Sequence, residues 1–363
     1  MINKKILIHV GYSKFPFDRT DLDNGTLAGT EYCAIRLAES LFQLGNQVTI
    51  HGEVKNSICN GVEYVSLGNL SSKFFDIVIG VAYGHLFEIL NEYRISFDKC
   101  FFWLHNEEPF IWYKGEELPD IEQRLFLNKN LSGIVLVSQA HKECFSNRYS
   151  YLPVEVLEAK TNVIENGYDV FDYDSSKVDK ITNRIIWSSG IDRGLSSILT
   201  NWGKIKKEVP NASFVICAPK YSENFNFDTA LFEQQDVVWL GQISKERLKQ
   251  EQLKAQWWLY PGDYFETFCL TELEMMNSKV RCLTSNGSNL KYLGSENRAV
   301  FLNSINPNQR LTEAINLIKQ SGIDKTLELK LTTSSNQALD WINRFNWDKK
   351  VQEWIKLFQN NKL

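Results

Sequence analysis

Three features that mark other protein classes are missing from this 363-residue sequence. No apolar stretch approaches the roughly 20 residues that span a bilayer, which argues against a transmembrane protein. Lys and Arg are scattered along a chain of net charge −4, so a basic face for nucleic acid is not expected. The seven cysteines lie far apart without a Cys-x-x-Cys pair, which argues against a disulfide framework or a zinc ribbon.

The remaining composition is that of a globular protein, with 43% apolar and 23% charged residues. Because single cores stop growing near roughly 250–300 residues, this length predicts two domains. Unpaired cysteines favour a reducing, cytoplasmic compartment. The basic start followed by a short apolar run favours a buried first strand over a signal peptide. We therefore expect a soluble cytoplasmic protein, with peripheral contact to a membrane surface left open.

Short apolar runs alternate with amphipathic segments along the first half of the chain. The clearest helical pattern spans Gly29–Leu44, with apolar residues at helical spacing. Such alternation favours a parallel sheet with helices on both faces. The predicted strands are Ile6–Val10, Gln47–Ile50, Asp76–Val81, Cys100–Leu104 and Gly133–Ser138.

The same alternation of apolar runs and amphipathic segments begins again after a polar, acidic segment at Tyr168–Asn183. We predict an α/β protein of two Rossmann-like, doubly wound domains that face each other across a cleft. The expected divisions are an N-terminal domain at 1–170, a linker at 171–183, and a second domain at 184–345. A C-terminal helix at about 346–363, within the aromatic stretch Trp341–Leu357, is expected to pack back on the first domain. The second set of predicted strands is Ile185–Ser189, Ser213–Ala218, Asp236–Leu240, Gln256–Tyr260 and Lys279–Thr284, with helices at Lys204–Val209, Lys245–Lys254 and Glu272–Met276.

Small residues precede the first long helix. Ala28-Gly29-Thr30 follows Gly11 and Gly25, and small residues at a helix start let backbone N–H groups approach a phosphate. An ordinary glycine-rich connection, with Thr30 as the helix N-cap, is the structural alternative. The spacing is not Gly-x-Gly-x-x-Gly, which disfavours a nicotinamide enzyme.

Polar residues also follow two predicted strands at the expected cleft edge. His105 comes after one apolar strand and can contact a ligand, although a lone histidine is often structural. In the second domain, Ser189 and Arg193 lie in a loop before a helix, where an arginine can form a bidentate pair with a diphosphate. A solvated arginine is the alternative there. Lys220 follows the next strand and can add charge at the same rim.

The segment from Tyr260 to Glu274 carries two carboxylates eight residues apart. Glu266 is expected at a helix start directly after a strand, facing the cleft. Glu274 is expected two turns further on, where it can accept hydrogen bonds from ribose hydroxyls. Two glutamates on a helix are common, so their context decides the interpretation.

Taken together, these segments resemble the retaining glycosyltransferases of GT-B family four. The resemblance covers nearly the whole chain. No single motif is decisive, and the order and spacing of the motifs support the assignment. Its parts are Glu-x₇-Glu from Glu266 to Glu274, Thr30-Glu31 after Gly29, Val137-Ser138-Gln139, Asn166-Gly167-Tyr168-Asp169, Asp192-Arg193-Gly194 and Val238-Trp239-Leu240-Gly241.

The resemblance implies transfer of a sugar from a nucleoside-diphosphate sugar to a glycan or other hydroxyl acceptor. Arg193 would neutralise the diphosphate, and His105 would lie near the reacting sugar carbon. No metal or other cofactor is implied, because arginine, lysine and helix N-termini supply the positive potential. The donor-site residues implied in this way are Gly29, Thr30, Ser189, Arg193, Lys220, Glu266, Thr267, Phe268 and Glu274, of which Glu266 would contact the sugar and Glu274 the ribose.

The sequence also departs from the family pattern. Ser189 or Gly190 stands where the family has an arginine, and Ala28 replaces a glycine. A catalytically silent GT-B module that binds sugar nucleotide or glycan is therefore an alternative function. A sugar-nucleotide epimerase or phosphorylase of the same fold is another. Acceptor selection is expected in first-domain loops, for which Asp18–Asn24 and Phe110–Leu118 are the candidates.

Overall fold

The computed structural model describes residues 3–13, 15–174, 177–218 and 228–359. The chain divides into two compact units. Unit 1 comprises Met1–Leu22, Leu27–Asp169 and Phe345–Leu363, and unit 2 comprises Asp23–Thr26 and Val170–Arg344. Among the described residues, no helix is long and apolar enough to cross a membrane. None of the seven cysteines, all of which are described, forms a disulfide.

Unit 1 is built on an eight-stranded sheet with the order β10-β9-β6-β5-β1-β2-β4-β3. All neighbouring strands are parallel except the hairpin of β3 and β4. The central strands are almost wholly buried because helices cover the sheet, and such strands read as continuous apolar runs. The strands are β1 (Lys5–Gly11), β2 (Gln47–Gly52), β3 (Ser57–Cys59), β4 (Val62–Ser66), β5 (Phe74–Val81), β6 (Ser96–Leu104), β9 (Gly133–Leu136) and β10 (Thr161–Val163), and a separate hairpin pairs β7 (Trp112–Tyr113) with β8 (Glu116–Glu117).

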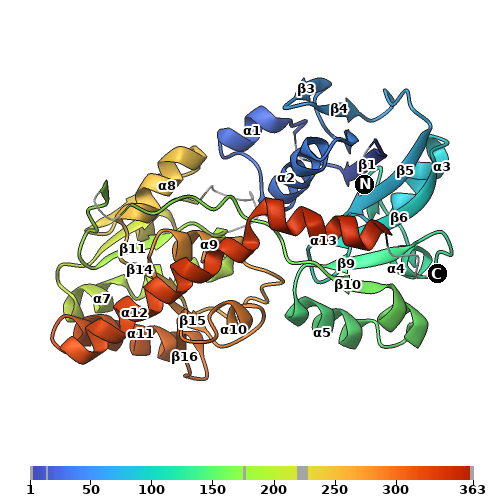
Figure 1. Ribbon diagram of the computed structural model, residues 1–363. Coiled ribbons are helices and arrows are strands. Elements are labelled where there is room, and N and C mark those ends of the chain that lie inside the picture. The colour runs from blue at the N-terminus through green and yellow to red at the C-terminus, as the bar shows by residue number, and fades with distance from the viewer. Residues whose placement is uncertain (1–2, 14, 175–176, 219–227, 360–363) are drawn as a thin grey trace. The chain divides into compact units, whose positions relative to one another are not determined.

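The helices of unit 1 connect these strands, and the last of them comes from the C-terminal part of the chain (Figure 1). They are α1 (Arg19–Asp23), α2 (Gly29–Gln43), α3 (Leu86–Glu92), α4 (Ile121–Phe126), α5 (Gln139–Arg148), a π-helical turn at Glu155–Lys160, and α13 (Trp347–Gln359).

Unit 2 is built on a six-stranded sheet, parallel throughout, with the order β13-β12-β11-β14-β15-β16. The prediction of two doubly wound α/β domains is thereby confirmed at the level of fold class. The strands are β11 (Arg184–Trp187), β12 (Ser213–Ile216), β13 (Val237–Trp239), β14 (Trp257–Tyr260), β15 (Arg281–Ser285) and β16 (Val300–Leu302). The helices are α6 (Leu195–Thr200), α7 (Trp202–Glu208), α8 (Lys245–Lys254), α9 (Leu270–Asn277), α10 (Leu290–Leu293), α11 (Pro307–Ser321) and α12 (Lys325–Trp341), with 3-10 turns at Ile191–Arg193, Thr229–Phe232 and Ile342–Phe345.

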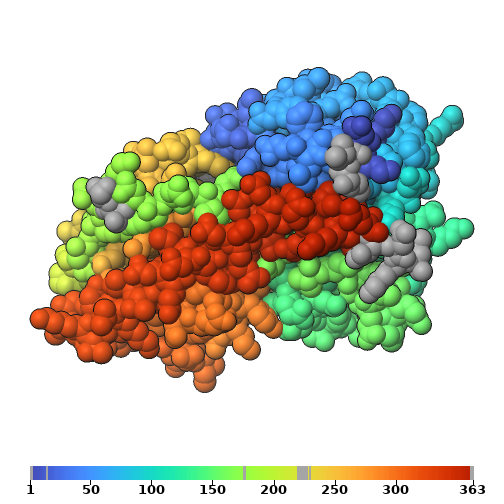
Figure 2. Space-filling view, viewed as in Figure 1, coloured from blue at the N-terminus to red at the C-terminus, as the bar shows by residue number. Residues whose placement is uncertain are grey.

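Helix α13 packs on α2 within unit 1, and Figures 1 and 2 show the two segments side by side. The Trp354 ring lies 4.9 Å from the ring of Trp103 on β6, measured between centroids. At the other end, Trp347 donates to the Tyr32 hydroxyl of α2 at 3.3 Å. A buried Lys350 ammonium pairs with Glu165 at 2.9 Å. These contacts make α13 an integral part of the unit 1 core.

The C-terminal helix expected at about 346–363 corresponds to α13 (Trp347–Gln359), and a 3-10 turn at Ile342–Phe345 separates it from α12. Several predicted strands end earlier than expected. The strand predicted at Ile185–Ser189 ends at Trp187, since Ser188 and Ser189 already belong to the following loop.

Gly167 illustrates how closely α13 is packed. A Cβ atom at this position would lie 2.3 Å from Cδ2 of the Trp347 indole, which is far inside van der Waals contact. The Asn166-Gly167 pair therefore has a structural role: it lets the chain pass beneath Trp347.

We predict that Gly167→Ala destabilises the protein by about 1–3 kcal/mol, because the indole has to move. Gly203→Ala is the control, since a Cβ there meets nothing within 4 Å on helix α7. Denaturant unfolding of both variants measures the effect. Equal stability of the two variants would contradict the packing argument.

Candidate functional site

The centre of the unit 2 sheet places two loops next to each other. Strand β11 pairs with β12 on one side and with β14 on the other, so the chain reverses its direction of winding between β11 and β14. In open parallel sheets, ligands bind beyond the carboxyl ends of the strands at this position. The loop after β11 carries Arg193, and the loop after β14 carries Glu266.

Glu266 is a buried carboxylate with two partners. Its Oε1 accepts hydrogen bonds from the Tyr260 hydroxyl and from Nη1 of Arg193, the latter at 3.3 Å. Burial raises the pKa of Glu266, while Arg193 and the Tyr260 hydroxyl oppose that shift. Tyr260 ends strand β14, and its ring stacks on Trp187 at the end of β11. The two central strands thus fix the position of this carboxylate directly.

Arg193 lies between a carboxylate and an aromatic ring. Its guanidinium carbon is 3.5 Å from the centroid of the Tyr264 ring. Burial opposes the charge, but the Glu266 carboxylate raises the pKa of Arg193 above its ordinary value. The side chain remains 30% exposed. A fixed and accessible guanidinium of this kind suits an anionic ligand such as a phosphate.

Glu266 and Glu274 do not share one helix, so the expected position of Glu266 at a helix start is wrong. Helix α9 begins at Leu270, because Cys269 takes a left-handed conformation with φ 75° that ends the preceding loop. Glu274 lies on α9, is partly exposed, and accepts a hydrogen bond from Gln252 of α8 at 2.8 Å. Burial raises the pKa of Glu274, opposed by Lys245 and Gln252.

Four further residues of unit 2 were expected in the donor site: Ser189, Thr267, Phe268 and Lys220. The Ser189 hydroxyl bonds the Thr271 hydroxyl at 3.3 Å, which joins the β11 loop to α9. Phe268 is buried, and its carbonyl accepts from Asn289 Nδ2 at 2.7 Å. Thr267 lies beside it and is partly exposed. Lys220 falls outside the residues that the structure describes.

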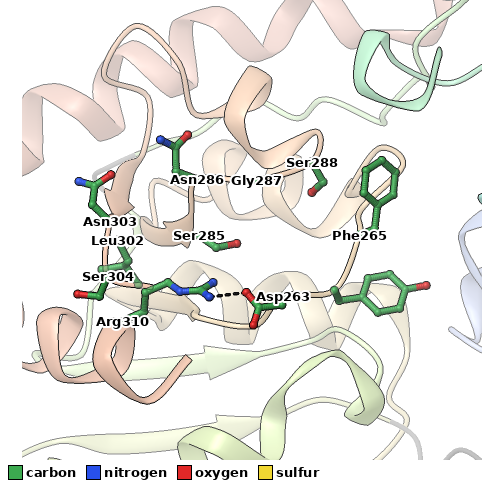
Figure 3. Close-up of a pocket in the computed structure, with 11 residues that line it drawn as sticks. Asp263, Phe265, Ser285, Asn286, Gly287, Ser288, Leu302, Asn303, Ser304 and Arg310 are labelled. Atoms are coloured by element: carbon green, nitrogen blue, oxygen red, sulfur yellow. Dashed lines mark hydrogen bonds and ion pairs between the residues drawn. The ribbon is translucent and has the colours of Figure 1, made fainter. Parts of the chain in front are cut away.

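A cavity of about 370 Å³ adjoins the Glu266 segment (Figure 3). Its walls come from the loop before Glu266, from the end of β15 and the loop after it, from the end of β16 and the residues after it, and from Arg310 on α11. Arg310 is buried, and it pairs with Asp263 and donates to the Gly262 carbonyl at 3.1 Å. Figure 3 shows Phe265 near Ser288, with the Arg310–Asp263 pair along another wall. The lining is mainly polar, which suits a hydroxyl-rich ligand.

Gly29 and Thr30 are the first two residues of α2 in unit 1. The N-cap is Ala28, without a side-chain hydrogen bond, so the alternative of Thr30 as N-cap is wrong. The Glu31 carboxylate, at the third position of the helix, accepts hydrogen bonds from the backbone N–H groups of Ala28 and Glu31, so a side chain caps part of this helix start. Gly29 is exposed, which leaves the helix start accessible to a phosphate.

His105 directly follows β6 in unit 1 and is buried. Its ring centroid lies 4.4 Å from that of Trp103. Burial, with a contribution from His141, lowers the pKa of His105 to about 3, so the imidazole is neutral at pH 7. A neutral imidazole can exchange hydrogen bonds with sugar hydroxyls without adding charge.

Sequence reasoning missed three side chains of this site. Tyr260 and Tyr264 flank Glu266 and Arg193, and Gln252 positions Glu274. Tyr260 ends a predicted strand, and that position indicates a side chain at the ligand-binding edge of the sheet. Nothing in the sequence spacing indicated that Tyr264 would lie over Arg193, since those residues are far apart along the chain.

A third glutamate, Glu272, lies between the two expected ones. It is completely buried, and neither carboxylate oxygen has a hydrogen-bond partner among the described residues. Burial raises the pKa of Glu272 well above its usual range, with a further contribution from Glu266. The folded protein therefore favours the neutral acid at this position.

No protein-family model and no curated protein matches this chain. Solved structures do match it at low sequence identity. HepE from Anabaena, solved with UDP and glucose, has a TM-score of 0.70 at 13% identity, over 98% of this chain and 99% of that chain. Sucrose-phosphate synthase from Thermosynechococcus elongatus has a TM-score of 0.71 at 12% identity, over 98% of both chains.

A glycosyltransferase from Rickettsia africae gives a TM-score of 0.68 at 15% identity, over 98% of both chains. HepE has also been solved with UDP-glucose. These likenesses give the chain the GT-B fold, with two Rossmann-like domains.

The buried Glu272 leads to a prediction about pH. The Glu272 carboxyl has a higher pKa in the folded state than in the unfolded state, where it is near 4.5. Its contribution to the free energy of unfolding is therefore fully present below the unfolded pKa, and it is lost as the pH rises through the folded pKa. We expect Glu272→Gln to raise the stability at pH 8 by about 1–3 kcal/mol, because the unpaired charge is removed. At pH 5 the gain should shrink.

Chemical denaturation at the two pH values measures this effect. Glu233→Gln is the matched control, since Glu233 is an exposed glutamate of the same unit. A gain that does not change with pH would show that Glu272 carries no charge-related penalty.

Proposed function

We propose that this chain is a retaining glycosyltransferase that uses a nucleoside-diphosphate sugar and needs no metal ion. The observation that carries the proposal is the contact of Arg193 with Glu266 at the carboxyl ends of β11 and β14. An arginine for phosphate and a carboxylate for hydroxyls thus meet at the ligand-binding edge of a doubly wound sheet. HepE, which has the same fold, has been solved with UDP-glucose.

In the proposed reaction, the bond from the anomeric carbon to the diphosphate oxygen breaks. The acceptor oxygen forms its new bond on the same face of the sugar, and its proton leaves with the nucleoside diphosphate. Negative charge grows on the departing diphosphate, and Arg193 would stabilise it, with the accessible N-terminus of α2 at Gly29 and Thr30 assisting. Glu266 would hold sugar hydroxyls as an acceptor, and it is not assigned the role of a general base.

Glu274 would bind the ribose, since Gln252 already orients its carboxylate. Neutral His105 would contact the donor sugar. Ser189, Thr267, Phe268 and Lys220 complete the proposed donor site. The acceptor would be a glycan or another hydroxyl compound, and the absence of disulfides among seven cysteines is in keeping with a cytoplasmic location.

A second candidate is a silent module that binds a sugar nucleotide or glycan. Ser189 favours it, because this position offers a hydroxyl bonded to Thr271 in place of a second cation. Nucleoside diphosphate binding without turnover on any acceptor would support this alternative. Incubation with a panel of sugar nucleotides decides the matter. If none is hydrolysed, transferred or bound, both candidates fail.

We predict that Arg193→Ala lowers kcat by about 100-fold or more, because the leaving diphosphate loses its positive partner. Arg193→Lys should retain part of the rate, since the charge remains while the two-pronged geometry is lost. Release of nucleoside diphosphate measures the rate. Arg124→Ala, which removes an exposed ion pair with Glu88 in unit 1, is the control and should leave kcat unchanged.

Glu274 is expected to act in binding only. Glu274→Ala should raise the KM for the sugar nucleotide by about 10-fold, the value of one charge-assisted hydrogen bond, with little change in kcat. Steady-state kinetics with varied donor concentration separate the two constants. A large fall in kcat at unchanged KM would remove Glu274 from the proposed ribose site.

A further inference from the structure

Unit 1 has its own point at which the winding direction reverses. Strand β1 pairs with β2 on one side and with β5 on the other. Tyr12 directly follows β1, and Tyr83 comes two residues after β5. The place where a doubly wound sheet binds its ligand is therefore occupied here by aromatic side chains, and none of them belongs to the donor site proposed above.

These side chains enclose a second cavity, of about 290 Å³, lined by Tyr12, Tyr83, Phe110, Trp112, Lys114 and Gly115. Phe110 and Trp112 are 44% and 55% exposed, so their rings are accessible from solvent. The volume lies at the lower limit of small-molecule pockets, which suits a single ring better than a long chain.

The pocket is held in shape by its surroundings. The Tyr83 hydroxyl donates to the Tyr12 carbonyl, and Gly11 is required beneath it, since a Cβ there would lie 2.2 Å from the Tyr83 ring. The buried His85 ring lies 5.3 Å from the Tyr12 and Tyr83 rings, measured between centroids. The aromatic walls are therefore built in advance, which lowers the entropic cost of binding.

One wall of the pocket is the hairpin of β7 and β8. Its turn residues, Lys114 and Gly115, both have positive φ angles, 51° and 85°, as a tight two-residue hairpin turn requires. This turn holds Trp112 at the pocket. Lys114 pairs with Glu92 at 2.9 Å, and Tyr113 donates to the same carboxylate. The positive charge at the rim is thereby neutralised, so the pocket offers no net attraction to a phosphate or an acidic sugar.

We propose that this aromatic pocket binds an uncharged pyranose ring of a glycan acceptor. The faces of aromatic rings carry negative potential, which attracts the weakly positive C–H groups on the face of a pyranose. The Tyr83 hydroxyl oxygen, whose proton is donated to the Tyr12 carbonyl, can still accept a hydrogen bond from a sugar hydroxyl. The inference rests on the proposed function, whose donor residues in unit 1 are Gly29, Thr30 and His105, and none of these lines the pocket.

The test uses the full-length protein on an array of neutral glycans, acidic glycans and isoprenoid phosphates. We expect neutral glycans to bind, and Trp112→Ala to weaken that binding by about 10-fold or more, as the loss of a central aromatic contact does. Phe110→Ala should weaken it as well, and Trp112→Phe should retain most of it. Phe74→Ala is the matched control, because Phe74 is 46% exposed in the same unit, outside the pocket, and should bind as the wild type does.

Three results would overturn the proposal: no neutral glycan binds, only charged or isoprenoid compounds bind, or Trp112→Ala binds as tightly as the wild type. A UDP thermal shift, measured on the same samples, separates this question from the proposed function. The shift should be equal in all variants, since none of the substituted residues belongs to the proposed donor site. A protein that binds UDP but no neutral glycan would refute the pocket assignment and leave the donor site standing.

Discussion

Parallel strand pairing is the constraint on which both units depend. Every described pair in the unit 2 sheet is parallel, and in the eight-stranded sheet of unit 1 the β3–β4 pair alone, among the described strands, is antiparallel. Parallel neighbours need crossover connections, and the crossover helices bury both faces of the sheet. Ligands are then left with the loops at the carboxyl ends. Both candidate sites follow from this geometry, one between β11 and β14 and the other between β1 and β5.

Much of the architecture was predictable because buried parallel strands appear as short apolar runs. The runs at Ile6–Val10 and Asp76–Val81 correspond to β1 and β5, and Gly29–Leu44 differs from α2 by one residue. The loop geometry was not predictable. The left-handed backbone at Cys269 separates Glu266 from α9, and a non-glycine residue gives no sequence signal for that conformation.

The three glutamates of the Glu266–Glu274 segment show a second limit of sequence reasoning. Glu266 contacts a tyrosine hydroxyl and an arginine, Glu274 contacts an amide, and Glu272 has no hydrogen-bond partner among the described residues. Their chemistry therefore differs although their residue type is the same, because burial and neighbours set the free energy of the charged form. Those neighbours come from β14, from the β11 loop and from α8, so only the folded chain distinguishes the three carboxylates.

The packing of α13 on α2 has a consequence for the order of folding during synthesis. Unit 1 requires Trp347, Lys350 and Trp354, yet the ribosome makes these residues only after all of unit 2. Once Asp169 has been made, the α2 surface around Tyr32 stays uncovered while about 175 further residues are translated, which takes roughly 9–35 seconds at typical elongation rates. Unit 2 can form its core in that interval, so the unit that begins first is completed last.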